Sequence, residues 1–260
     1  RSFHVTGVQT CALPISASGT VTTIRTADPV HLVNTWLPQL LQRSDSMFPT
    51  GAYAHSFGME GAVQDGLIND EADFRAFIHD MIIPGLEKLE LPTAAAAFAA
   101  AQDADLAKLC ELDQLYGAMK PSRELREATA RTGRQRLSLN LELTGEPFWR
   151  DIEQARLAKR LEAYEPIVLG TQGALGQMPL DDTLGLAFYH GLTPFVNAAL
   201  KLVRMGQLAC QKILSEALGQ TGGVVERAKR ISIEEMGWLC PALDISSSRH
   251  ETAFSRLFIS

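Results

Sequence analysis

From Trp36 onward, apolar residues recur at the three- and four-residue spacing of amphipathic helices, and no long stretch alternates between apolar and polar positions. The apolar set from Phe74 to Met81 is an example, and Asn69 or Asp70 before it is expected to cap the helix. The pattern predicts an all-α fold, a single-domain bundle of roughly ten helices.

Turn-forming and capping residues divide this pattern into successive segments. Pro84-Gly85 is expected to bend or end the first of them, because proline lacks the N–H that a helix interior needs. Further helices are predicted to start near Thr93, after a cap at Ser122 and at Pro166. Others are predicted from about Asp105 to Met119 and from Asp151 to Tyr164. A last long helix is predicted from Asp181 or Asp182 to about Leu218, divided at Gly191 to Pro194.

Small residues concentrate in two of the predicted helices. Alanine dominates between Ala94 and Ala101, and Gly170, Gly173 and Gly176 follow a G-x-x-G-x-x-G spacing. The G-x-G-x-x-G loop of dinucleotide-binding proteins has a different spacing and follows a strand, so it is not indicated. Because such small side chains let neighbouring helices approach closely, we predict a packing role for both segments.

Residues Arg1 to about Ser18 show neither helical nor strand periodicity. They also lack the basic start and the apolar middle of a secretory signal. We therefore expect a non-native or disordered leader at residues 1–18 and one helical domain at residues 19–260.

Charge and composition narrow the classes of function. The formal net charge of −6 argues against a surface built to attract nucleic acid. No apolar run reaches the roughly 18 residues of a membrane helix, so no membrane partner is expected. The four cysteines include no C-x-x-C pair, which disfavours a zinc knuckle or a disulfide framework and favours a cytoplasmic protein.

One segment departs from this acidic balance. Between Lys120 and Arg136 the chain carries six basic and two acidic residues, a local charge of +4. Two interpretations stay open: a solvated helix face with i,i+4 ion pairs, or a contact for an acidic partner protein.

Motifs of known active sites are missing from the sequence. It contains no G-x-x-x-x-G-K-[ST] phosphate loop and no G-x-S-x-G elbow. Its histidines form no H-x-H or H-E-x-x-H spacing, so no single segment supplies a metal site. A P-loop GTPase and an α/β-hydrolase are therefore not indicated.

Two segments are nonetheless too unusual for packing alone, and the first is SDSMFPTGAYAHSFGME at residues 44–60. Its Pro49-Thr50-Gly51 predicts a tight turn with a positive φ at Gly51, and His55 is expected to begin a helix. Asp45, His55 and Ser46 or Ser56 could act as base and nucleophile. We favour the plainer interpretation that a carboxylate satisfies a buried imidazole.

The second segment is the C-terminal PALDISSSRHETAFSRLFIS. Phe254, Leu257 and Phe258 stand at i, i+3 and i+4, which predicts one apolar stripe on a last helical turn. A polar rim is expected from the charged cluster Arg249, His250, Glu251 and Arg256. The stripe is predicted to be buried either in the chain's own domain or in a partner.

Both segments resemble the terminal blocks of the urease accessory protein F family. Glu127 to Leu137 and Lys201 to Leu214 resemble that family's middle blocks in the same order, so the likeness covers about Leu37 to Ser260. Two positions depart from the family pattern R-L-V-P-L-G-Q: Lys201 replaces its arginine, and Arg204 replaces its proline. Lysine cannot offer the bidentate fork of arginine.

The resemblance implies an all-helical, non-enzymatic maturation factor without a catalytic residue, cofactor or metal of its own. Members of the family are understood to form dimers, to bind the accessory protein UreD (UreH in some species) and to recruit the GTPase UreG. The assembly acts as a chaperone that delivers nickel to apo-urease. The partner-binding residues expected here are Pro49, Gly51, Tyr53, His55, Ser56, Glu60, Arg131, Arg134, Lys201, Gln207, Asp244, Arg249, His250, Glu251, Phe254, Arg256, Leu257 and Phe258.

Two other interpretations remain beside the adaptor. One is a small helical enzyme that uses Asp45 and His55. The other is a chain that itself binds nickel through His55, His250 or Cys240.

Overall fold

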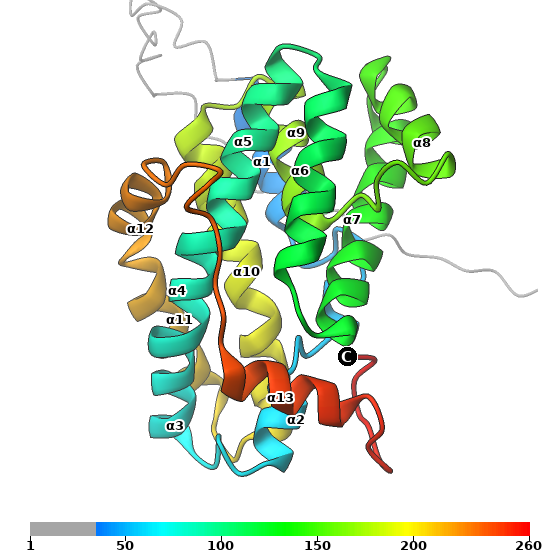
Figure 1. Cartoon of the computed structure of the whole chain (residues 1–260). Coiled ribbons are helices and arrows are strands. Elements are labelled where there is room, and N and C mark those ends of the chain that lie inside the picture. Colours follow the sequence, from blue (N-terminus) through cyan, green and yellow to red (C-terminus); the bar gives the residue numbers. More distant parts are fainter. Residues whose placement is uncertain (1–34) are drawn as a thin grey trace, which may run out of the picture. The chain divides into compact units, whose positions relative to one another are not determined.

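A computed structural model describes residues 35–260, and this part of the chain consists of helices joined by loops, with no strand. It belongs to one compact unit that begins at Asn34, so the predicted leader at residues 1–18 lies outside the described residues. The expected all-α fold is confirmed (Figure 1). In chain order the elements are α1 (Trp36–Ser44), η1 (Ala52–Ala54), α2 (Met59–Gln64), α3 (Glu71–Ala76), η2 (Phe77–Ile82), α4 (Ile83–Gly85), η3 (Leu86–Glu90), α5 (Leu91–Gln102), α6 (Leu106–Met119), α7 (Arg123–Leu143), α8 (Phe148–Leu157), α9 (Glu165–Leu175), α10 (Leu180–Leu202), α11 (Gln207–Leu218), α12 (Thr221–Ala228) and α13 (Pro241–His250).

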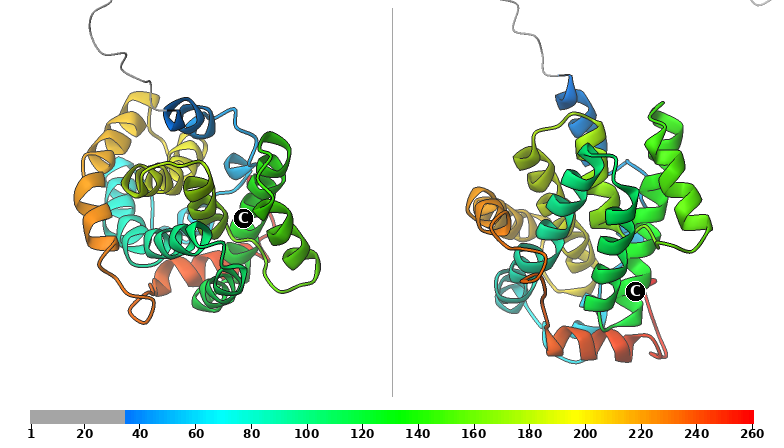
Figure 2. Two further views of the ribbon diagram at one scale, coloured as in Figure 1. Left: turned by 90° about the horizontal axis from the view of Figure 1, so that it is seen from above. Right: turned by 45° about the horizontal axis from the view of Figure 1, so that its top comes forward.

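Two apolar clusters form the core. One joins α3, α10, α11 and α12 and includes Phe74, Phe188 and Ile213, while the other joins α5 to α9 and includes Tyr116 and Trp149. Helix α9 lies among the surrounding helices, and most of its residues are buried (Figure 2). Because α5 contributes to both clusters, it connects the two halves of the core.

The predicted packing role of the small residues is confirmed where α5 meets α9. A Cβ atom added at Gly170 would lie 2.1 Å from the carbonyl oxygen of Ala94, and one added at Gly173 would lie 2.3 Å from the Thr183 side chain. At Gly170 the backbones of α5 and α9 are therefore in direct contact, whereas Gly173 faces a side chain of α10, and only glycine fits at these two positions.

We expect Gly170→Ala to destabilise the fold by roughly 1–3 kcal/mol or more, because the new methyl group meets rigid backbone. Thermal unfolding is the measurement, with a drop of roughly 2–4 °C per kcal/mol at this size. Gly185→Ala in α10 is the matched control, since its Cβ would meet nothing closer than 3.8 Å. An equal loss in both variants would contradict tight packing between α5 and α9.

The helix does not end at Pro84-Gly85, where the sequence predicts a bend or an end, and the separate start predicted near Thr93 is wrong. Elements α3, η2, α4, η3 and α5 follow one another without a break, and η2 and η3 are π-helical turns that precede Pro84 and Pro92. A π-helical turn changes the hydrogen-bond register, which accommodates residues that have no N–H to donate.

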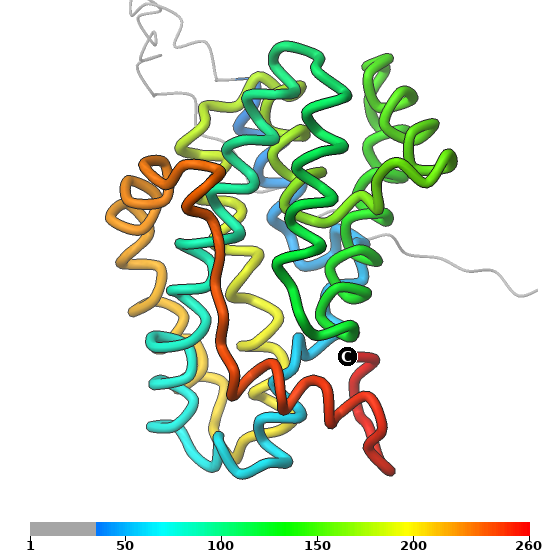
Figure 3. Tube along the Cα trace, in the orientation of Figure 1, coloured from blue at the N-terminus to red at the C-terminus, as the bar shows by residue number. Residues whose placement is uncertain are grey.

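A long-range contact helps to stabilise the continuous run from α3 to α5, which we call the irregular helix. Pro92 leaves the carbonyl oxygen of Lys88 without its usual helical donor, and Gly237 N–H binds that oxygen at 3.0 Å. Gly237 belongs to the strap, our name for residues 230–240, which runs along the helix from α12 to α13 (Figure 3). The Trp238 ring lies against Gly85, where a Cβ would approach its Cδ1 atom to 2.9 Å.

Two predicted caps are confirmed. The Asp70 carboxylate accepts hydrogen bonds from two main-chain N–H groups of α3, and Ser122 caps α7. Helix α6 begins at the predicted place, and the structure adds that Asp105 caps it. Short polar side chains satisfy the free N–H groups of a first helical turn, which explains why these boundaries could be predicted.

Other boundaries differ from the prediction. Helix α8 ends at Leu157 and does not reach Tyr164. Helix α10 starts after Pro179 without a side-chain cap, continues through Pro194 and ends at Leu202, where a short loop separates it from α11. His55 does not begin a helix, because it follows η1 with an extended backbone.

Candidate partner-binding site

The loop from Ser44 to Gly58 is held by local turns. The Asp45 carboxylate accepts a hydrogen bond from Met47 N–H at 2.7 Å. Gly51 has a φ of 75°, as predicted, and Phe57 has a φ of 49°. A bulky side chain in the left-handed region is strained, and such strain is common where a chain must present particular groups.

Helix α13 packs directly on α2. A Cβ at Gly61 would lie 2.4 Å from the carbonyl oxygen of Ser246. The Ser246 hydroxyl donates to Asp65 at 2.7 Å, and the buried Ser247 hydroxyl lies 2.9 Å from that of Ser122 at the start of α7. These contacts bring the two unusual sequence segments together at one end of the bundle (Figure 1).

The end of α13 places His250 between two buried carboxylates. Its Nδ1 atom lies 2.9 Å from Glu124 Oε1, and its Nε2 atom lies 3.1 Å from Glu60 Oε2. Arg256 lies 3.5 Å from the same Glu124 oxygen. All three side chains of this Glu60–His250–Glu124 cluster are at most 6% exposed, so the cluster connects α2, α7 and α13 inside the protein.

Residues 251–260, which we call the returning chain, run back from His250 along the segment at residues 44–60. The Glu60 carboxylate accepts Leu257 N–H at 2.7 Å and Phe258 N–H at 2.9 Å. Ile259 N–H donates to the carbonyl oxygen of Ala54 at 3.0 Å. A buried carboxylate that accepts two main-chain N–H groups holds this stretch through its backbone, whatever side chains it carries.

The last residue is buried against the same loop. The Ser56 hydroxyl donates to the carbonyl oxygen of Ser260 at 2.6 Å, and His55 Nδ1 lies 2.7 Å from the Ser260 hydroxyl. The expected carboxylate partner of His55 is therefore wrong: Asp45 binds Met47, and the imidazole is satisfied by a hydroxyl. The arrangement also does not bring Asp45 and His55 together as a catalytic pair.

Burial, and after it the charge of Arg131, lowers the pKa of His55 to about 4. Below pH 6.5 the unfolded chain gains a proton at His55 that the folded protein excludes, so the free energy of unfolding falls as the pH drops toward 4. Between pH 7 and pH 5 we expect His55 to account for a loss of roughly 2 kcal/mol.

Urea unfolding of the native chain and of His55→Gln at both pH values measures this difference. The variant should show a smaller loss, although not none, because the pKa of buried His190 is also lowered, to about 3. Equal losses in the two proteins would show that His55 is not the responsible group.

The predicted helical stripe at the C-terminus is wrong. Helix α13 ends at His250, and the residues after it are not helical. Phe258 is 6% exposed and packs in the core with Lys201 Nζ 5.1 Å from its ring centre, whereas Phe254 is fully exposed and Leu257 is 60% exposed. Outside a helix, side chains at i, i+3 and i+4 no longer share one face.

The basic run on α7 is largely paired. Arg131 lies near Glu127 in an i,i+4 pair, and Arg134 Nη1 is 2.9 Å from Glu162. Arg136 is not on the surface: it is fully buried, and its Nη2 atom lies 2.6 Å from Glu165. These ion pairs match the interpretation of the basic run as a solvated helix face. Fewer unpaired basic side chains are therefore left on α7 than the sequence count indicated.

The predicted residues divide into two groups. A buried group makes the contacts just described and consists of His55, Ser56, Glu60, His250 and Phe258. An exposed or partly exposed group can meet a partner and consists of Pro49, Gly51, Tyr53, Arg131, Arg134, Lys201, Gln207, Asp244, Arg249, Glu251, Phe254, Arg256 and Leu257. Within the second group, Asp244 accepts from Cys240 N–H at the start of α13, and Arg249 contacts Asp65.

Sequence reasoning missed Glu124, Ser122 as a partner of Ser247, and Asp65. Each binds a residue more than a hundred positions away, so no local spacing could reveal it. Among residues 35–260 no three histidine, cysteine or acidic side chains are grouped as a metal site, and no helix has the length and hydropathy to cross a membrane.

Fold and site together define an all-helical protein whose C-terminal segment returns to a loop near α2 and leaves apolar side chains exposed beside it. A sequence model of the UreF family matches residues 68–218, more than half of the chain. The chain belongs to the UreF family.

Individual relatives agree with this assignment. The chain is 34% identical over 225 residues to the urease accessory protein UreF of Azoarcus sp. (strain BH72), which covers 85% of this chain and 94% of that protein. It is 36% identical over 217 residues to the protein of that name from Methylobacterium radiotolerans, which covers 81% and 91% of the two chains.

Proposed function

We propose that the chain acts in urease maturation as a non-enzymatic adaptor, which binds a second accessory protein (UreD, or UreH in some species) and the GTPase UreG for nickel insertion into apo-urease. Family membership supports the urease maturation role. One observation supports the adaptor role most directly: the protein fixes its C-terminal backbone through Glu60 while Phe254 and Leu257 stay exposed.

The first partner would bind the tail surface, which we define as Tyr53, Phe254, Leu257 and Ile259. Between 49% and 108% of each side chain is exposed. Ile259 N–H donates a hydrogen bond to the carbonyl oxygen of Ala54, so the neighbouring Tyr53 lies beside the returning chain. Exposed aromatic and aliphatic groups on a fixed backbone suit a protein interface, because little conformational entropy is lost when they are buried.

The GTPase would bind next to this surface. Lys201 is exposed and contacts Phe258 of the returning chain, and Gln207 begins α11 after the short loop. A lysine there suits an acidic surface, although as a point charge without the geometry of arginine. The expected homodimer and the cytoplasmic location belong to the same proposal.

The test is the double variant Phe254→Ala/Leu257→Ala, co-expressed with UreD, UreG and urease. Neither side chain is buried, so the fold should be unchanged. The affinity for UreD should fall by roughly a hundredfold or more, and UreD should no longer co-elute with the variant on size-exclusion chromatography. Urease activation should fall with it. Leu157→Ala, an exposed leucine on α8, is the matched control and should keep its partners.

Undiminished UreD binding by the double variant would contradict the tail surface as the interface. A chain that elutes alone under every condition, with or without the substitutions, would contradict the adaptor role itself. The alternative as an Asp45/His55 enzyme loses its geometric basis, because these residues have separate partners.

A further inference from the structure

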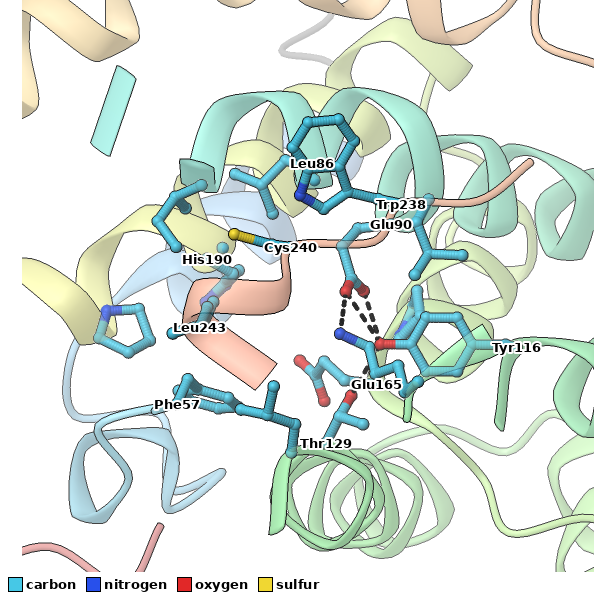
Figure 4. Close-up of a pocket in the computed structure, with 18 of the residues that line it drawn as sticks. Phe57, Leu86, Glu90, Tyr116, Thr129, Glu165, His190, Trp238, Cys240 and Leu243 are labelled. Atoms are coloured by element: carbon cyan, nitrogen blue, oxygen red, sulfur yellow. Dashed lines mark hydrogen bonds and ion pairs between the residues drawn. The ribbon is translucent and has the colours of Figure 1, made fainter. Parts of the chain in front are cut away.

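A partly open cavity of about 170 Å³ borders the site and shares Phe57 and Asp244 with it. Its walls come from the irregular helix, α6, α7, α9, α10, the strap, α13 and the loop before α2, and Figure 4 shows Leu86, His190, Trp238, Leu243 and Phe57 around it. Protein interiors rarely leave spaces much larger than a water molecule. A space of this size between so many elements therefore calls for an explanation.

Its size matches a small ring. An engineered apolar cavity of about 150 Å³ binds benzene. The walls here are mainly aliphatic and aromatic, and Met81, Leu125 and Phe195 complete them. The hydrophobic effect thus favours an apolar molecule of about that volume.

Three polar groups at one end of the cavity satisfy one another. The Tyr116 hydroxyl donates to Glu90 at 2.8 Å, and Lys120 Nζ lies 2.6 Å from the same carboxylate (Figure 4). Thr129 lies 3.4 Å from the Tyr116 hydroxyl. Burial lowers the pKa of His190 to about 3, so this histidine adds no charge at neutral pH.

Glu165 also lines the cavity and pairs with Arg136 through Oε1, but its Oε2 atom has no partner among residues 35–260. Asp244 accepts from Cys240 N–H. These two carboxylates disfavour an anionic ligand, and the largely apolar walls favour a neutral one.

One donor in the wall stands apart. The Nε1–H group of Trp238 is buried and has no acceptor among residues 35–260. It lies on the ring edge that faces Gly85, and the indole is placed between Leu86 and Cys240 (Figure 4). A buried donor without a partner is costly, and an acceptor on a bound molecule would remove that cost.

We propose that this cavity binds a neutral aromatic or similarly sized apolar small molecule that carries one hydrogen-bond acceptor for Trp238. The ring occupies the space between Leu86, Phe195 and Leu243, and the acceptor faces the indole. Such a ligand binds beneath the strap. The proposed ligand site does not depend on the adaptor role proposed above.

Two isosteric probes test the proposal on the full chain labelled with ¹⁵N. Acetophenone has a carbonyl acceptor, and ethylbenzene has the same ring without one. Acetophenone should shift the Trp238 indole resonance in a saturable way, and ethylbenzene should bind roughly tenfold more weakly. Trp238→Phe identifies the resonance, because the chain has only two other tryptophans, Trp36 and Trp149.

A variant that fills the cavity separates specific from surface binding. Ala187→Phe adds a ring at the cavity wall and should abolish the shift, and Ala187→Leu serves if the larger substitution unfolds the protein by circular dichroism. Ala99→Phe on the exposed side of α5 is the control and should bind normally. No saturable shift, or binding that survives in a folded Ala187 variant, would overturn the proposal. Equal affinity for both probes would overturn the role of Trp238.

Discussion

Replacing His250 by alanine should lower the free energy of unfolding by roughly 3–5 kcal/mol, because it leaves Glu60 and Glu124 buried without the group between them. At this chain size the loss corresponds to a fall in melting temperature of around 10 °C or more. The substitution also removes a contact that joins α13 to α2 and α7. Thermal and urea unfolding measure the effect.

The same variant should loosen the returning chain. Glu60 holds the N–H groups of Leu257 and Phe258, so their amide hydrogen exchange should become faster once the cluster relaxes. The control is His79→Ala, which removes a partly exposed imidazole bonded to Gln220. A loss below about 1 kcal/mol for His250→Ala, or unchanged exchange at both amides, would show that the cluster does not hold the segment.

The helical class and the caps could be predicted because their causes are local. Asp70 and Ser122 each act on N–H groups within three positions, and the sequence displays both partners. The small residues around Ala94 and Gly170 were similarly informative, since their size limits what can lie against them.

The continuous helix through Pro84 and Pro92 could not be predicted, because its compensation is distant. Proline rules describe a helix in isolation, whereas here Gly237 supplies a donor from about 150 positions away. Pro194 within α10 shows the same limit. Tertiary contacts outweigh local preference when the rest of the helix is well buried.

The site was predicted in part for a similar reason. The two unusual segments were identified, but the pairing of His250 with Glu124 and the non-helical course after α13 depend on acceptors in other helices. The spacing of Phe254, Leu257 and Phe258 suits a helix. Glu60 instead accepts two of the N–H groups in this stretch, which a helix would need for its own hydrogen bonds.

Two truncations should give sharply different results. A chain that ends at Thr252 keeps α13 and the Glu60–His250–Glu124 cluster, so its helix content should stay near that of the full chain. It loses the burial of Phe258, which is worth roughly 1.5–3 kcal/mol, together with three side chains of the tail surface. We therefore expect a modestly less stable protein whose affinity for UreD is reduced by orders of magnitude.

A chain that ends at Pro241 should behave differently, because it also loses α13. Gly61, Ser122 and both glutamates of the cluster would face open space where Ser246, Ser247 and His250 pack. Circular dichroism and thermal unfolding should then show a large loss of structure. If the Thr252 truncation unfolds as extensively, the returning chain serves the fold and the loss of partner binding is secondary. If it retains UreD at full affinity, the tail surface is not the interface.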